Sequence, residues 1–366
     1  MMDVSVVIPT HNQKERLRLV LSGLQAQTFL ASRFEVIVVD DGCRDETAEM
    51  LEDVSRHIPF KTIHFPSNVG RCKARNRGVA EARGEFVAFL DGDALPHPEW
   101  LQSCWDAFER CGPAALLCGF EYSLPDLEHL QDPQVGSLMD KPISSVVREY
   151  IRLRLDEMII TEEMVHGDFA RIHRRAREGG YPFPELKVMQ DQIIELFAQY
   201  PDSPLGWIGF SPHNGVVPRS AFEQVGGFDE EIDFSEGWEL TYRLQQAGIQ
   251  PCFVPQARTY HLYHYHDFSD EAKVEAEYAV RRRAIDYMVW KHQDAKLLLL
   301  HFWLAGIWPD PFLPEEALLY DLVHFHQCHQ EIEEVGLSDL RRIISRHPVW
   351  GSSAPTFREA CGQQAC

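Results

Sequence analysis

Short apolar runs alternate with segments of helical periodicity along the first third of the chain. The run Val4–Ile8, which ends at Pro9, predicts a buried strand, and similar runs predict strands at 34–39, 61–65 and 86–90. Strands that alternate with helices imply a mostly parallel sheet covered by helices on both faces. In such sheets ligands bind beyond the carboxyl ends of the strands.

Three helices are predicted between these strands. The first begins at a capping box formed by Asn12 and Glu15, and its apolar face consists of Leu17, Val20, Leu21 and Leu24. A second helix contains the segment 50–54, and a third spans about 70–83. Each of these helices therefore has the position of a crossover between two parallel strands.

The rest of the chain has a different composition. Residues 122–205 combine charged helical segments with a basic run at 171–177, whereas 211–266 is rich in glycine and aromatic residues. After residue 270 the pattern is helical to about residue 346, apart from a proline-rich interruption at 308–314.

The net charge limits the classes of partner. The chain has 366 residues, and 35 Lys and Arg against 56 Asp and Glu give a formal charge of −21. A surface this acidic repels nucleic acid and anionic membranes, so we expect no nucleic-acid partner. A ligand that carries phosphate would need a local basic pocket or a bound cation. The nine cysteines have no C-x-x-C spacing, which argues against a zinc ribbon or a disulfide framework.

No segment has the pattern of a signal peptide or a membrane span. The first apolar run is too short and lacks a basic flank, and the later run 297–308 is far shorter than a transmembrane helix. We therefore expect a cytoplasmic protein without a transmembrane segment, either free or peripheral to the membrane.

The acidic motif Asp91-Gly92-Asp93 follows the predicted strand 86–90. Two carboxylates at a strand end can face one divalent cation, because Mg²⁺ and Mn²⁺ prefer hard oxygen ligands and often bridge to phosphates. The alternative is a simple turn, since Asp-Gly is a common hairpin signal. The position after a buried strand, with Asp41 at another strand end, favours the metal site.

Four basic side chains surround the start of the third predicted helix, namely Arg71, Lys73, Arg75 and Arg77. Helix N-termini and guanidinium groups both suit phosphate. The alternative is a solvated basic helix face. In a chain this acidic, beside the aspartates, we favour contact with a phosphate group.

Five motifs occur in a fixed order along the chain. They are Val-Val-Ile-Pro-Thr-His-Asn at 6–12, Val-Val-Asp-Asp-Gly at 38–42, Asn-Val-Gly at 68–70 with Ala-Arg-Asn-Arg-Gly at 74–78, Phe-Leu-Asp-Gly-Asp at 89–93, and Val-Gly-Gly-Phe-Asp-Glu at 225–230. Together they resemble a family 2 glycosyltransferase with the GT-A fold, an α/β fold with a Rossmann-like, mostly parallel sheet flanked by helices. The resemblance covers 4–120 and about 211–266.

The resemblance implies an enzyme that transfers a sugar from a nucleotide-diphosphate sugar, with UDP as the expected nucleotide, to an acceptor with inversion at the anomeric carbon. It also implies a divalent cation, Mn²⁺ or Mg²⁺. The expected GT-A domain is 1–268, divided into a nucleotide-binding half (1–120), an inserted segment (121–205) and an acceptor and catalytic half (206–268). A helical C-terminal region would follow at 269–366.

The resemblance also assigns roles to single residues. Those expected to contact the donor are Pro9, Thr10, His11, Asp41, Arg71, Arg75, Asp91, Gly92, Asn214 and Trp238. The expected metal ligands are Asp93, Asp91 and His261. His11 departs from the family, which often has Tyr there, and Ala94 stands where a further Asp is common. The change at His11 leaves the identity of the nucleotide base open, and the change at Ala94 leaves Asp93 as the only acid directly after Gly92.

The catalytic base is expected just after the Gly-Gly-Phe-Asp-Glu stretch, where the family usually has a Glu-Asp pair. Gly237 stands at the usual Asp, so the base is displaced, supplied by a neighbour or absent. Glu236 is the first choice and Glu239 the second. The alternative is that these acids only begin a helix, since acids favour its first turn.

Three histidines follow a predicted strand at 251–254. In a regular strand His264 and His266 would face one side and His261 the other. A late histidine often completes the metal site of GT-A enzymes, and His261 fits that place best. The alternatives are a hydrogen-bonded aromatic ribbon and a zinc site made by all three histidines.

Two other classes of protein compete with this hypothesis. A nucleotidyltransferase would also use an α/β sheet and a metal, but Pro9-Thr10-His11-Asn12 is not its glycine-rich loop. Gly237 is compatible with a nucleotide-sugar-binding protein that has lost catalysis. The donor sugar stays open, and so does the acceptor: a saccharide, a lipid-linked precursor, a small molecule or a peptide. The helical tail could complete the acceptor cleft or pair two subunits as a homodimer.

Overall fold

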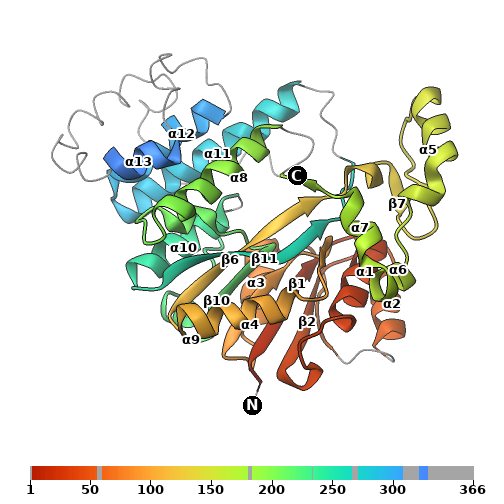
Figure 1. Ribbon diagram of the computed structural model, residues 1–366, viewed down its shortest axis with the longest axis horizontal. Coiled ribbons are helices and arrows are strands. Elements are labelled where there is room, and N and C mark those ends of the chain that lie inside the picture. The colour runs from red at the N-terminus through yellow and green to blue at the C-terminus, as the bar shows by residue number, and fades with distance from the viewer. Residues whose placement is uncertain are drawn as a thin grey trace.

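A nine-stranded sheet forms the centre of the computed structural model (Figure 1). The structure describes residues 2–55, 60–179, 184–232, 234–265, 271–307 and 321–328. The strand order is β3 (Lys61–Phe65), β2 (Phe34–Asp41), β1 (Val4–Thr10), β4 (Phe86–Leu90), β10 (Asn214–Pro218), β6 (Ala115–Ser123), β11 (Gln250–His261) and β5 (Ala94–Pro96), with β9 (Arg177–Glu178) paired to β6. The four strands predicted in the first third of the chain are thereby confirmed.

The sheet is mostly parallel, as predicted. Strands β1, β2, β3 and β4 run parallel, and β6 is parallel to β11, whereas β10 is antiparallel to both of its neighbours. The carboxyl ends of β1, β2 and β4 therefore meet at one edge. This α/β architecture confirms the predicted GT-A class.

Helices cover both faces of the sheet because the central strands are apolar on both sides. In β1, Val4, Val6 and Ile8 face one core cluster and Val7 faces the other. The first cluster is covered by α1 (Lys14–Gln25), α2 (Thr47–Val54) and α4 (Trp100–Cys111). The second is covered by α3 (Arg71–Val79), α9 (Arg219–Gln224) and α10 (Glu236–Gln246).

The predicted capping box at the start of α1 was wrong. The helix begins at Lys14, and Asn12 lies before it in a left-handed conformation with φ of 54°. The Asn12 side chain accepts a hydrogen bond from the backbone N–H of Arg44 at 2.8 Å instead of capping the helix. Asn tolerates this backbone conformation better than most residues, and here it ties together the loops that follow β1 and β2.

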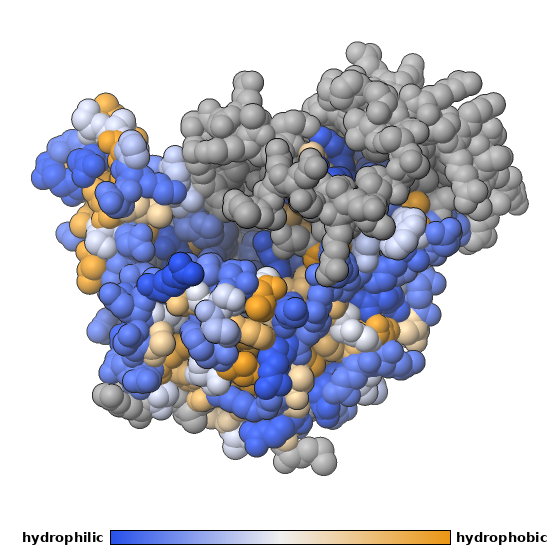
Figure 2. Space-filling model, turned by 180° about the vertical axis from the view of Figure 1, so that it is seen from behind, coloured by the Kyte–Doolittle hydropathy of each residue, from blue (hydrophilic) through white to orange (hydrophobic). Residues whose placement is uncertain are grey.

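The segment between β6 and β10 packs on the first core cluster at one end. It contains β7 (Leu130–Asp132), β8 (Ser137–Leu138), α5 (Ser145–Met158), α6 (Glu162–Gly167), α7 (Phe169–Arg175) and α8 (Pro184–Gln199). Helix α5 extends outward from the body, as Figures 1 and 2 show, and exposes Val146, Tyr150 and Leu153. Short 3-10 turns are η1 (Ala31–Arg33), η2 (Pro125–Leu127), η3 (Gly206–Gly209) and η4 (Ala295–Leu298).

A third core cluster joins α8 to the later helices. These are α11 (Glu271–His292), α12 (Leu299–Ile307) and α13 (Leu322–Cys328), which gather above one end of the sheet in Figure 1. In the described part of the chain, every helix is too short or too polar to cross a bilayer. The predicted interruption at 308–314 and the predicted helix beyond residue 328 lie outside the described residues.

Asn214 connects three strands in the centre of the fold. Its buried amide accepts a hydrogen bond from Trp100 Nε1 at 2.8 Å and donates to the carbonyls of Phe120 and Ala257 at 3.1 and 2.9 Å. Gly119 makes room for it, because a Cβ there would lie 2.2 Å from Asn214 Oδ1. The side chain predicted to contact the donor sugar is therefore fully used in holding the sheet together.

We expect Asn214→Ala to lower the free energy of unfolding by about 3 kcal/mol, because it leaves buried donors and acceptors without partners. Urea unfolding followed by circular dichroism measures this loss. A matched control is Gln199→Ala, which removes one exposed hydrogen bond within α8, to Glu195. Equal unfolding midpoints for the two variants would contradict this role for Asn214.

Candidate active site

Polar side chains meet where three parallel strands end. His11, after β1, has Nδ1 2.7 Å from the backbone oxygen of Asp41 at the end of β2. Gln13, two residues further on, donates to Asp93 Oδ2 at 3.0 Å. The structure thus brings the strand-end motifs together at one edge of the sheet, where the parallel arrangement places a ligand.

Asp41 fixes the loop that leads into α3. Its buried carboxylate accepts hydrogen bonds from the backbone N–H groups of Val69 and Gly70 at 2.6 and 3.1 Å. Gly42 allows the close approach, because its φ is 70° and a Cβ there would lie 2.4 Å from the Ser67 backbone. The N-terminus of α3, with Arg71 exposed at its start, is held beside the strand ends in this way.

Arg75 is the buried centre of the site. Its guanidinium donates from Nη2 to Asp91 Oδ1 and from Nη1 to Glu236 Oε1, both at 2.8 Å. Burial lowers the pKa of Arg75, but the charges of Asp91 and Glu236 outweigh that effect and raise it, so the group stays charged. One side chain therefore joins α3, the end of β4 and the start of α10.

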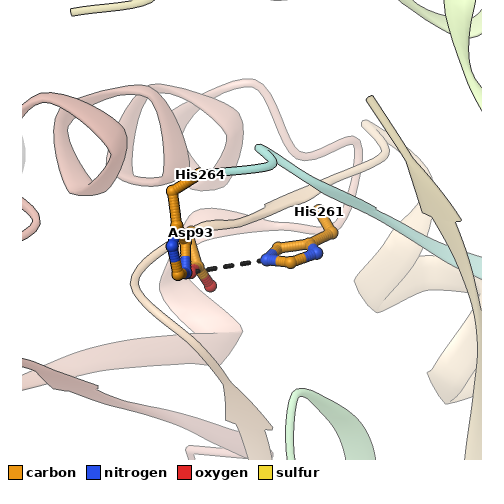
Figure 3. A group of neighbouring side chains, drawn as sticks. All are labelled: Asp93, His261 and His264. Atoms are coloured by element: carbon orange, nitrogen blue, oxygen red, sulfur yellow. Dashed lines mark ion pairs between the residues drawn. The ribbon is translucent and has the colours of Figure 1, made fainter. Parts of the chain in front are cut away.

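Asp93, His261 and His264 form a group that could hold a metal ion (Figure 3). The Nε2 atoms of His261 and His264 lie 3.6 and 3.4 Å from Asp93 Oδ2. The prediction that the two histidines face opposite sides was wrong, because β11 ends at His261 and the chain then turns. His266 lies outside the described residues.

These donor atoms suit a divalent transition metal. One ligand atom from each residue lies within 4.8 Å of the others, and one carboxylate with two imidazoles is a ligand set typical of Mn²⁺, Fe²⁺ and Zn²⁺. The buried hydroxyl oxygen Oγ1 of Thr10 has no hydrogen-bond partner among the described residues, and a Cβ at Gly92 would lie 3.2 Å from this oxygen. Asp91, the other predicted ligand, is engaged by Arg75 and is not part of this set.

Asp93 is ionised in this setting. Burial raises the pKa of its carboxyl group, but hydrogen bonds from His261 and His264 outweigh burial and hold the pKa well below the usual range. An ionised carboxylate that already faces two imidazoles is prepared for a cation, which could replace the ion pairs by direct bonds.

Arg16 supports the loop that carries these histidines. Its buried guanidinium donates to the backbone oxygens of Leu262 and Tyr263 at 2.8 and 3.0 Å, between His261 and His264. It also donates to the carbonyls of Leu130 and Gln131, at 2.9 and 3.2 Å. The loop after β11 is therefore tied to α1 and to β7.

The two glutamates predicted as the base are both paired with cations. Glu236 is bound by Arg75, and although burial raises the pKa of its carboxyl group, the charge of Arg75 outweighs burial and lowers it. Glu239 is fully buried and contacts Arg243, Lys291 and His292. These contacts tie α10 to α11, and the carboxylate of Glu239 has no exposure to solvent.

Trp238 was expected to contact the donor but packs elsewhere. Its ring centre lies 5.8 Å from that of Trp303, at the edge of the third core cluster. Trp207 is buried and lies edge-on to Tyr242. These contacts place both indole rings against other aromatic side chains and not among the strand ends.

Sequence reasoning missed Glu121. This residue lies near the end of β6, and its Oε2 is 3.0 Å from Nε2 of His213, in the segment that enters β10. Burial lowers the pKa of His213, but the charge of Glu121 outweighs burial and raises it to about 9. The signal was present, because Glu121 follows the apolar run 115–118 as the other acids follow their strands.

The pairing of Glu239 with Arg243, Lys291 and His292 predicts that the free energy of unfolding depends on pH. Burial raises the pKa of Glu239, but His292, Arg243 and Lys291 outweigh it and lower the pKa to about 2, from an ordinary 4.5. The lowered pKa stabilises the fold above pH 4.5, and the stabilisation, about 3 kcal/mol, is lost as the pH falls towards 2. Urea unfolding of the wild type and of Glu239→Gln across this range measures it.

The difference between these two proteins should therefore shrink as the pH falls from 4.5 to 2. Glu223→Gln is the matched control, because Glu223 is an exposed carboxylate in a pair with Arg219 on the surface of α9. A constant difference for Glu239→Gln across the range would refute the lowered pKa.

The histidine and aspartate group predicts a metal affinity that single substitutions remove. We expect Asp93→Asn and His264→Ala each to weaken Mn²⁺ binding by on the order of 100-fold, since even changes next to a metal ligand cost 10–100-fold. Isothermal titration with MnCl₂ measures the affinity. His326→Ala, which changes a histidine of α13 that contacts Ser203, should bind Mn²⁺ as the wild type does. Equal affinities throughout would exclude this site.

Comparison with known proteins finds similar sequences among the glycosyltransferases. Residues 5–175 match the model of glycosyl transferase family 2. The pre-mycofactocin glycosyltransferase of Mycobacterium tuberculosis is 28% identical over 262 residues, which are 71% of this chain and 42% of that protein. The validoxylamine A glucosyltransferase of Streptomyces hygroscopicus subsp. jinggangensis is 30% identical over 256 residues, which are 67% of this chain and 52% of that protein.

The chain spans about half the length of these curated relatives. Among solved structures, S. aureus TarS 1–349 in complex with UDP is 17% identical, with a TM-score of 0.47 over 94% of this chain and 78% of that chain. The sequence matches thus make this chain similar to glycosyl transferase family 2, and residues 5–175 are the part that matches the family model.

Proposed function

We propose that the protein transfers a sugar from a nucleotide-diphosphate sugar to a hydroxyl group of an acceptor, with help from a divalent cation. The observation that carries this proposal is the strand-end site, in which Asp93, His261 and His264 lie beside the Arg75–Asp91 pair. A cation and fixed positive groups at one place suit a diphosphate. They are also what an acidic protein needs in order to bind one.

The relatives support glycosyl transfer as the reaction. Two of them are named as a pre-mycofactocin glycosyltransferase and a validoxylamine A glucosyltransferase. We extend sugar transfer to this chain, with UDP as the nucleotide of the donor. The support for UDP is the Val-Val-Asp-Asp-Gly motif, whose Asp41 stands where the family's base-contacting carboxylate does.

Residues around the strand ends would each have a different role in binding the donor. Arg71 at the N-terminus of α3 would contact phosphate oxygens, because a helix N-terminus and a guanidinium both attract anions. Arg75 would hold Asp91 in a fixed orientation for the ribose. A cation bound by Asp93, His261 and His264 would offset the negative charge of the departing diphosphate.

Inversion at the anomeric carbon is part of the proposal. A single displacement needs a general base near the hydroxyl group that receives the sugar. It uses no nucleophile from the protein. Glu236, the first choice for the general base, is bound by Arg75 and only 7% exposed, so its carboxylate would have little access to an acceptor hydroxyl.

Gly237 favours a second candidate function. Because the usual carboxylate is missing, the chain could bind a nucleotide sugar without transferring it. This candidate predicts donor binding without release of nucleoside diphosphate, which separates it from an active transferase.

A thermal-shift screen tests the donor site, which both candidates require. We expect one nucleoside diphosphate to raise the melting temperature in the presence of Mn²⁺, because a ligand at a hundred times its dissociation constant adds about 2.7 kcal/mol of stability. UDP, GDP, UDP-glucose and GDP-mannose would be compared on the wild type, on Asp93→Ala and on His326→Ala as the control.

The shift should require Mn²⁺, disappear in Asp93→Ala and persist in the control. A shift with GDP alone would reject UDP as the nucleotide. If no nucleotide stabilised the wild type, the proposed donor site would be refuted.

A further inference from the structure

The usual place of the catalytic carboxylate is filled by another part of the chain. A Cβ at Gly237 would lie 2.7 Å from Cδ and 3.0 Å from Cγ of Pro212, and 3.5 Å from Phe210. A side chain at 237 would therefore collide with the segment that enters β10. The missing carboxylate is thus a feature of the packing, and one substitution would not restore it.

The same segment presents a different pair of ionisable groups. His213 follows Pro212 directly and pairs with Glu121 at 3.0 Å. Ser211, on the other side of Pro212, has its hydroxyl oxygen 2.7 Å from His213 Nδ1. Pro212, whose ring excludes a side chain at residue 237, therefore lies between Ser211 and His213. The imidazole of His213 contacts both the Ser211 hydroxyl and the Glu121 carboxylate.

Solvent reaches this pair but not the two glutamates of α10. The side chains of Glu121 and His213 are 24% and 37% exposed, whereas those of Glu236 and Glu239 are 7% and 0% exposed. The general base must contact the molecule that receives the sugar. Of these three carboxylates, only Glu121 combines solvent access with a partner that can orient it.

Glu121 also lies next to the candidate metal group. In the parallel pairing of β6 and β11, Glu121 is opposite Thr259 and Ser123 is opposite His261. Because side chains two residues apart share one face of a strand, Glu121 and His261 are diagonal neighbours on that face. His261 belongs to the candidate metal group, so this face of the sheet carries both Glu121 and a candidate metal ligand.

We propose that Glu121 is the general base of sugar transfer and that His213 orients its carboxylate. This inference rests on the proposed function. The acceptor oxygen forms a bond to the anomeric carbon, and the bond from that carbon to the diphosphate oxygen breaks with its electron pair. The hydroxyl proton of the acceptor passes to a carboxylate oxygen of Glu121, so atoms and charge balance without any further reactant.

Glu121 is ionised and can accept a proton. Burial raises the pKa of its carboxyl group, but the charge of His213 and the hydrogen bond between them outweigh burial and lower it. His213 would act as a positioning residue, because it contacts the carboxylate and needs no contact with the sugar.

Donor hydrolysis with water as the acceptor tests this assignment without knowledge of the natural acceptor. The assay measures release of nucleoside diphosphate from UDP-glucose, UDP-N-acetylglucosamine and GDP-mannose with Mn²⁺. We expect Glu121→Gln to lower kcat by 10²–10⁴-fold, the usual contribution of a general base. Its dissociation constant for the nucleoside diphosphate and its melting temperature should stay at wild-type values.

Further variants separate catalysis from a structural role. Glu121→Asp should keep part of the activity, His213→Gln should lose less than Glu121→Gln, and Glu223→Gln on α9 should match the wild type. Sodium formate, which supplies a small external carboxylate, should restore part of the rate of Glu121→Ala. A structural role would produce no such rescue.

Two results would overturn the assignment in different ways. If Glu121→Gln kept wild-type kcat while Glu236→Gln abolished turnover, sugar transfer would stand and Glu236 would be the base. If the wild type neither bound a nucleoside diphosphate nor released one from any of the three donors, the proposed function itself would fail, and the base with it.

Discussion

The buried guanidinium of Arg75 is the interaction on which the site depends. A charge at 2% exposure is costly unless it is paired, and Arg75 has one carboxylate on each side, Asp91 and Glu236. These three residues belong to α3, to the end of β4 and to the start of α10. Two helices and a strand are thereby fixed relative to one another, at the edge of the sheet where the strand-end loops gather.

A second arginine plays the corresponding part at the metal group. Arg16 donates from α1 to four backbone carbonyls, two of which lie in the loop between His261 and His264. A loop has many conformations, so two imidazoles on it would seldom face one carboxylate without such support. The two buried arginines thus hold different parts of the site, Arg75 the Asp91 carboxylate and Arg16 the loop with His261 and His264.

The packing around Gly237 leaves no room for a side chain at the position where the resemblance predicts a carboxylate. Pro212 occupies the space beside Gly237, and the segment that carries Pro212 also delivers His213 to Glu121. Three elements meet here, since Glu121 lies in β6, Pro212 and His213 precede β10, and Gly237 lies in α10. The helix and strand framework can therefore stay unchanged while the candidate proton acceptor comes from a different strand.

The sequence by itself determined the sheet and the edge at which the strand-end motifs gather. The apolar runs that end at Pro9, Asp40 and Asp91 predicted β1, β2 and β4, because buried parallel strands are apolar on both faces. It also pointed to Asp93 and to His261, since acids at strand ends and a late histidine fit a cation site. These signals are local in the chain, and local patterns are what periodicity can report.

Only the tertiary structure decided which groups meet and which are already occupied. It placed His264 beside His261, because β11 ends before the alternation of a strand would have separated them. The structure also shows that Asn214 forms hydrogen bonds within the sheet and that Glu239 pairs with cationic side chains. Both residues had been predicted to belong to the site. It also brought Glu121 to His213, a pair that lies far apart in sequence. The physical reason is that burial, pairing and solvent access depend on contacts between distant segments, which no spacing along one chain specifies.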